Sequence, residues 1–281
     1  MSVTATDIRS LPAPRRQWSR YRHPQSTVRF AVILAILAFL GWSIAFLNID
    51  LQRILGAFPR LAEILATRYF PPDIGYVTDA DFVRSVIRTL EMSLLGGFLG
   101  VVCSIPLAWL AARNITISKR IAYPIARFAI MGSRSIHETI WTILFVTVLG
   151  FGMLAGTLAL TVFCVGFAGK LFSDELEAID MGPVEALRSV GANPLQVFQY
   201  AVLPQIRVAF TGIAIYTWDV AFRAATVVGF FGGGGMGWYL KRTTQQMEST
   251  RVAAILLVIV GLVLLAEIGS GWLRRKIGRM R

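Results

Sequence analysis

The chain has 281 residues, of which 55% are hydrophobic and 16% are charged, and its mean hydropathy is +0.62. A soluble domain has a far more polar mixture, so most of the chain is predicted to lie in a lipid bilayer as one all-α domain. The formal net charge of +12 sits largely in the two tails, which indicates membrane orientation and lipid contact and argues against nucleic-acid binding.

The first part of the chain contains one span and one amphipathic segment. Residues 1–27 are polar and basic and are predicted to be a cytoplasmic tail. Residues 28–48 form the first span, which is too long for a cleaved signal and has no convincing cleavage site after it. Residues 51–70 alternate apolar and charged side chains at helical spacing, so a helix lying in the membrane interface is expected there.

The second span is predicted at residues 89–112. Gly96, Gly97 and Gly100 give it a small-residue face, which is typical of helices that approach one another closely. The basic loop at residues 113–120 is placed on the inner side.

The third span, at residues 121–149, contains a polar cluster near mid-membrane depth. Arg134, His137 and Glu138 are candidate residues of a translocation pathway, because ionisable groups in a membrane usually face a cavity or one another. Two readings remain open: one helix that carries the cluster, or two shorter helices that meet at an aqueous break near Arg134.

The fourth and fifth spans are predicted at residues 154–172 and 206–231. Asp219 and Arg223 lie one helical turn apart in the fifth, where they can pair on one face, and they join the pathway candidates. The run after the fifth span is interpreted as an outer break or gate. Its residues are Gly232, Gly233, Gly234 and Gly235.

The sixth span is predicted at residues 252–272, and a basic tail at residues 274–281 places the carboxyl terminus inside. Six spans with both ends inside are therefore expected. The membrane domain is predicted to cover residues 28–273.

The loop at residues 177–204 is too polar to be a span and is predicted to fold as two short helices at an angle. Pro183 suits a first helical position, Glu185 falls in the first turn where it can accept free N–H groups, and Gly191 stops the helix. Asn193-Pro194 caps the second helix, which Leu203-Pro204 is expected to end. Such a loop on a membrane protein indicates a docking element for a soluble partner.

Signatures of catalysis and metal binding are absent from the sequence. There is no GxxxxGK[ST] phosphate loop, GxSxG elbow, HExxH pair or Cys/His cluster with metal spacing. Cys103 and Cys164 both fall in apolar segments and are expected to be packing residues. The chain is thus predicted to be no enzyme and to bind no cofactor or metal itself.

The central loop resembles the EAA loop of binding-protein-dependent ABC importer permeases. Two positions depart from the pattern: Leu187 stands where a second alanine is usual, and Ala201 where isoleucine is usual. The resemblance implies a type I ABC importer permease fold with six transmembrane helices and a cytoplasmic coupling helix. It also implies that ATPase coupling depends on Glu185, Ala186, Leu187, Gly191, Ala192, Leu203 and Pro204.

Residues 70–73, 182–193 and 225–237 further resemble the phosphonate/phosphate branch of these permeases. That resemblance implies a homodimer in the bacterial cytoplasmic (inner) membrane, two ATP-binding subunits that carry ATP and Mg, and an external phosphonate-binding protein. The implied solute is phosphonate or a related oxyanion such as phosphate or phosphite.

Two questions about the solute stay open. Arg134 and Arg223 either ease the passage of an oxyanion or only neutralise Glu138 and Asp219. The alternatives for the whole chain are an importer of another small solute such as methionine, and a membrane scaffold or enzyme without an ATPase partner.

Overall fold

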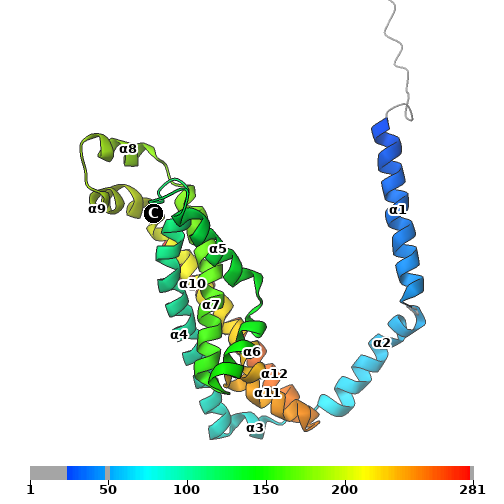
Figure 1. Cartoon of the computed structure of the whole chain (residues 1–281). Helices are drawn as coiled ribbons and strands as arrows, with labels where there is room; N and C mark the ends of the chain where they lie inside the picture. The colour runs from blue at the N-terminus through cyan, green and yellow to red at the C-terminus, as the bar shows by residue number, and fades with distance from the viewer. Residues whose placement is uncertain (1–23, 48–50, 279–281) are drawn as a thin grey trace, which may run out of the picture. The chain divides into compact units, whose positions relative to one another are not determined.

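The computed structural model describes residues 24–47 and 51–278, which contain helices and no strand (Figure 1). The chain divides into two units, residues 1–63 and residues 64–281, and each is described by itself.

The first unit consists of two helices. α1 (Pro24–Phe46) is apolar over 20 residues, which is long enough to cross a bilayer, so the first predicted span is confirmed. α2 (Leu51–Ile64) is amphipathic, as predicted, and exposes Leu55 and Phe58. Its place at a membrane interface stays a prediction. The predicted amino-terminal tail lies mostly outside the described residues.

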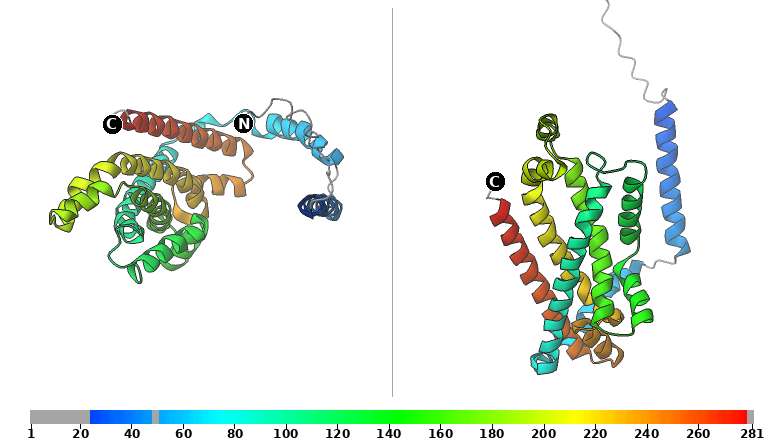
Figure 2. Two further views of the ribbon diagram at one scale, coloured as in Figure 1. Left: turned by 90° about the horizontal axis from the view of Figure 1, so that it is seen from above. Right: turned by 60° about the vertical axis from the view of Figure 1, so that its left-hand side comes forward.

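The second unit is built around four long apolar helices, each of them long enough to cross a bilayer. α7 lies in the middle of the bundle, against both α4 and α10 (Figure 2). The four helices are α4 (Ala80–Ala111), α7 (Met153–Glu177), α10 (Leu203–Val228) and α12 (Ser249–Gly278).

The predicted glycine face of α4 packs against α7. A Cβ atom on Gly96 would lie 2.8 Å from the Cβ of Leu160, and one on Gly100 would overlap the Cβ of Cys164. The two backbones approach closely because these positions lack side chains. The buried Cys164 is a packing residue at this contact, as expected.

The third predicted span is broken into α5 (Ala122–Ser135) and α6 (Glu138–Leu149), with Ile136 and His137 in extended conformation between them. The prediction of two shorter helices is therefore confirmed, and the aqueous nature of the break stays a prediction. Within the described residues five helices are long and apolar enough to cross a bilayer, and the short pair α5–α6 takes the place of a further one. α7 fits into the break at Gly166, where a Cβ atom would lie 2.8 Å from the backbone nitrogen of Arg134.

Three short elements lie at the end of the bundle opposite α8 (Gly182–Ser189) and α9 (Pro194–Val197), and only the one that follows α10 was partly included in a predicted span (Figure 1). Tyr76, Phe82 and Tyr239 pack there in one aromatic cluster, with Phe82 edge-on to Tyr239 at 5.6 Å. Phe82 is buried in this cluster, which explains why α4 begins nine residues before the predicted span. The three elements are α3 (Ile74–Thr78), the π-helical turn η3 (Gly229–Gly233) and α11 (Met236–Gln245).

Candidate functional site

The loop between α7 and α10 folds as two short helices, as predicted: α8 (Gly182–Ser189) and α9 (Pro194–Val197). Glu185 lies in the first turn of α8, but the prediction that it accepts free N–H groups there is wrong. The Asp180 carboxylate takes that place, because the Gly182 N–H donates to its Oδ1 at 2.9 Å. The Glu185 side chain is exposed and makes no hydrogen bond or ion pair with any described residue. Its carboxylate therefore remains available to a partner.

Gly191 ends α8 with a left-handed backbone, at φ +80°. Its N–H donates to the Arg188 carbonyl at 3.1 Å, and the Ala192 N–H donates to the Leu187 carbonyl at 3.1 Å. These two bonds form a Schellman motif, so the predicted helix stop is confirmed. A Cβ atom on Gly191 would have no neighbour within 4 Å in this chain.

Asn193 begins the second helix with a complete capping box. Its Oδ1 accepts from the Gln196 N–H at 2.8 Å, and the Gln196 Oε1 accepts from the Asn193 N–H at 2.9 Å. The predicted cap is therefore confirmed.

The prediction that Leu203-Pro204 ends the second helix is wrong. The helix continues through the π-helical turn η2 (Phe198–Val202) directly into α10, so that residues 194–233 form one helical run. Pro204 lacks an N–H group and would crowd the carbonyl four residues before it in an ordinary α-helix. The preceding turn is wider, since the Leu203 N–H donates to the Phe198 carbonyl five residues back, and this turn accommodates the proline.

An apolar core joins the predicted coupling loop (residues 177–204) to the ends of α4 and α7 that lie next to it. Val184, Val197 and Val202 are buried there against residues of both helices, and Trp109 meets Phe198 edge-on at 5.2 Å. Leu187 and Ala192 pack partly buried against the same core. These two predicted coupling residues therefore stabilise the loop by packing against the core.

Other side chains of the loop point away from that core. Val190 is 79% exposed, Leu195 70% and Tyr200 67%. Three large apolar side chains exposed on one loop indicate a surface for contact with another protein. Together with the free carboxylate of Glu185, they define what we call the docking face.

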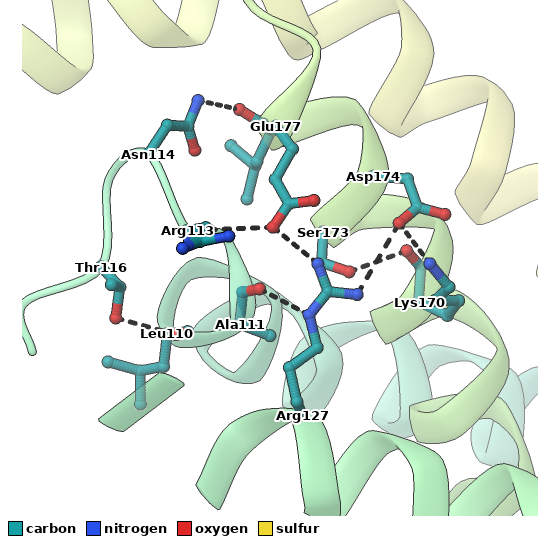
Figure 3. Close-up of polar contacts among 11 residues, drawn as sticks. Leu110, Ala111, Arg113, Asn114, Thr116, Arg127, Lys170, Ser173, Asp174 and Glu177 are labelled. Atoms are coloured by element: carbon teal, nitrogen blue, oxygen red, sulfur yellow. Dashed lines mark hydrogen bonds and ion pairs between the residues drawn. The ribbon is translucent and has the colours of Figure 1, made fainter. Parts of the chain in front are cut away.

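A cluster of charged side chains lies where α7 ends and the loop begins, and Figure 3 shows its contacts. The carboxylate of Glu177, the last residue of α7, accepts from the Arg113 N–H at 2.9 Å and from Nη2 of Arg127 at 2.6 Å. Nε of Arg127 donates to the Ala111 carbonyl at 2.8 Å. α4, α5 and α7 are thereby joined where the coupling loop begins. The sequence did not predict a role for Arg127, because its partner Glu177 lies 50 residues away along the chain.

The first group of pathway candidates lies at the break between α5 and α6. His137 caps α6, since its Nδ1 accepts from the Thr139 N–H at 3.3 Å, and its Nε2 lies 3.4 Å from Oε2 of Glu138. Arg134 is exposed, and no described residue pairs with its side chain. Glu138 thus faces His137. The alternative, a pair between Arg134 and Glu138, is not observed among the described residues.

The second group lies on α10, and its predicted pairing is confirmed. Nη2 of Arg223 lies 2.9 Å from Oδ2 of Asp219, whose side chain is 2% exposed. The other Asp219 oxygen and the Trp218 Nε1 are buried without a partner among the described residues. No hydrogen bond or ion pair between described residues joins this group to the one at the α5–α6 break.

The glycine run is tightly packed rather than open. Gly232, Gly234 and Gly235 have φ values of +113°, +86° and +70°, which side-chain-bearing residues rarely adopt. The Gly152 N–H donates to the Gly232 carbonyl at 3.1 Å, and a Cβ atom on Gly156 would lie 3.0 Å from the Cα of Gly233. The run therefore packs closely between the start of α7 and the end of α10 in this conformation, and its role as an outer gate stays a prediction.

Residues 104–279 match the model of the family described as binding-protein-dependent transport system inner membrane component. The chain belongs to this family.

Three relatives are similar to this protein over most of the chain. The phosphite transport system permease protein of Stutzerimonas stutzeri is 39% identical and covers 96% of this chain and 97% of its own length. A putative phosphite transport system permease protein of the same organism is 31% identical over 91% of this chain and 87% of its own. The phosphate-import permease protein of Mycolicibacterium smegmatis is 36% identical over 75% of this chain and 39% of its own.

Solved structures place the fold among the ABC importers. The inward-facing MetNI methionine ABC transporter matches with a TM-score of 0.62 and 26% identity, over 70% of this chain and 95% of that one. A bacterial ABC transporter for import of alginate matches with a TM-score of 0.59 and 16% identity, over 90% and 98%, and shows the fold alone. The predicted type I ABC importer permease fold is confirmed. A member of this permease family is a transport subunit and not an enzyme.

Proposed function

We propose that this permease translocates phosphonate or a related phosphorus oxyanion, such as phosphate or phosphite, across the cytoplasmic membrane. The observation that carries the solute class is the similarity to the phosphite permease, which extends over nearly the whole of both chains. The methionine permease of Escherichia coli is 29% identical over 54% of this chain, so methionine is the second candidate.

The working assembly consists of two copies of this chain, two ATP-binding subunits and an external solute-binding protein. The docking face supports the ATP-binding partner, because Glu185, Val190 and Leu195 are exposed and the Glu185 carboxylate has no partner among the described residues. This assignment places the coupling loop and both termini in the cytoplasm, and it places α3 and α11 on the outer side.

The helical run of residues 194–233 provides the mechanical connection. It begins at the cap of α9 on the docking face and ends in the glycine turn at the opposite end of the bundle. A push on α8 by a closing ATPase reaches α10 through the shared core around Val202. Rigid helices transmit such a displacement over their whole length, so the glycine run at 232–235 is where the outer side opens.

The solute passes the two membrane-embedded cations. Arg134 is exposed and unpaired among the described residues, and Arg223 uses one nitrogen for Asp219 and keeps further N–H donors. A guanidinium presents several donors in a plane, which matches the oxygens of a phosphorus oxyanion.

Transport by the purified assembly tests the proposal. The permease, its ATP-binding subunit and its binding protein are reconstituted in liposomes, and ATP-driven uptake of methylphosphonate, phosphite, phosphate and methionine is compared. We expect saturable uptake of at least one phosphorus oxyanion and none of methionine. Uptake of methionine alone would replace the first candidate with the second.

A further inference from the structure

A cavity of about 350 Å³ opens at the end of the bundle opposite the coupling loop. Three segments form it: the turn between α6 and α7, the glycine turn, and α11. The predicted coupling and pathway functions use none of its side chains. Its lining residues are Phe151, Gly232, Trp238, Lys241, Arg242 and Gln245.

The charge of this cavity is positive and uncompensated. Lys241 and Arg242 both line it, no acidic residue does, and neither cation forms an ion pair with a described residue. Two carboxylates, those of Asp73 and Glu248, pair with Arg251 instead, at 3.3 Å and 2.7 Å, while Oε2 of Glu248 is buried without a partner among the described residues. Adjacent cations without a carboxylate partner attract a soluble anion.

The cavity also has a defined shape. The Arg242 guanidinium lies over the Trp238 ring at 5.6 Å, which restrains its position. Gln245 follows Lys241 by four residues and so lies on the same face of α11, where its amide adds a neutral hydrogen-bond donor. Phe151 and Trp238 supply the aromatic part of the lining, with Trp238 next to Arg242 on α11.

We propose that this cavity is an outer capture site for a phosphorus oxyanion that bears one apolar substituent, as phosphite and phosphonates do. The cations and the amide hold the oxygens, and the aromatic part of the lining accepts the P–H or P–C group. Gly232 lines the cavity, so an anion that is bound there lies next to the glycine run. The inference rests on the proposed function and adds to it a solute site in the permease itself.

Protection of Lys241 from chemical acetylation tests the site without transport. The lysines of the chain are Lys119, Lys170, Lys241 and Lys276, and mass spectrometry resolves each after digestion. The purified assembly in nanodiscs is treated with a water-soluble acetylating reagent, with methylphosphonate, phosphite, sulfate or chloride added. We expect methylphosphonate and phosphite to slow acetylation of Lys241 severalfold and to leave Lys119 unchanged. Equal rates in all four anions, or a Lys241 that never reacts, would overturn the proposal.

Uptake by variants separates this inference from the proposed function. Lys241→Gln and Arg242→Gln should each raise the KM for methylphosphonate uptake about five- to tenfold with kcat unchanged, since each removes one charge-assisted contact. Lys119→Gln, an exposed lysine in the loop between α4 and α5, is the matched control and should leave KM unchanged. Unaltered KM in both cavity variants, with normal wild-type uptake, would refute the cavity alone. A wild-type assembly that imports no phosphorus oxyanion would instead refute the proposed function.

Discussion

Gly191→Trp will abolish ATP-driven uptake in whole cells and leave the permease folded. A Cβ atom at Gly191 would have no described neighbour within 4 Å, so the added side chain starts from open space on the exposed side of the loop. The left-handed backbone at φ +80° costs a residue with a side chain about 1 kcal/mol, which is too little to unfold the bundle. The ring does project from the docking face into the space that the ATPase is proposed to fill.

Two further variants show whether the effect arises at that contact. Gly191→Asn tolerates the same backbone and adds little volume, so its uptake should stay near the wild-type level. Glu185→Gln keeps the shape of the side chain and removes the charge, and we expect uptake to fall about tenfold or more, as for loss of a charged hydrogen bond. Glu175→Gln, a change of an exposed carboxylate near the end of α7, is the matched control.

These variants are compared by uptake, by ATP hydrolysis stimulated by the binding protein, and by the thermal midpoint of the purified permease. We expect Gly191→Trp and Glu185→Gln to lose stimulated hydrolysis and uptake together at an unchanged midpoint. Wild-type uptake by Gly191→Trp would contradict the coupling role of this loop.

Arg134→Gln will lower the kcat/KM of uptake about tenfold or more without destabilising the protein. Its side chain is exposed and pairs with no described residue, so its removal leaves no buried charge behind. A cation at this depth is costly in lipid and is retained where it meets an aqueous path. Arg134→Lys keeps the charge and should recover part of the activity, and Arg88→Gln, an exposed arginine of α4, serves as the control.

Arg223 needs a different design because it has a buried partner. Arg223→Gln alone leaves the Asp219 carboxylate unpaired at 2% exposure, which costs about 3–5 kcal/mol and can prevent assembly. The double variant Asp219→Asn/Arg223→Gln removes both charges and should assemble. If Arg223 contacts the solute, this assembled double variant remains defective in uptake. Normal uptake by the double variant and by Arg134→Gln would remove both arginines from the translocation pathway.

Local features of the sequence predicted local structure well. The helix stop at Gly191 and the capping box at Asn193 depend on hydrogen bonds between residues at most five positions apart. Both therefore follow from residue type and order alone. The apolar lengths of α4, α7 and α12 likewise follow from composition.

The errors occurred where a neighbour outside the local pattern decides the outcome. Pro204 was expected to end a helix, but the wide π-helical turn before it removes the clash. Asp180 takes the capping role that Glu185 was expected to have, because its carboxylate accepts from the N–H of Gly182 two residues further along the chain. The bond between Arg127 and Glu177 joins residues that only the folded bundle brings together.

Photo-crosslinking from the docking face tests the central claim most directly. A photoreactive benzoylphenylalanine replaces Val190, which is 79% exposed at the tip of the coupling loop, in the assembled complex. The same residue replaces Phe151, also 79% exposed, beside Gly232 and α11 as the control. We predict that position 190 forms an adduct with the ATP-binding subunit and that position 151 does not. An ATP-binding subunit that never crosslinks at position 190, in a complex that hydrolyses ATP and transports, would contradict the account.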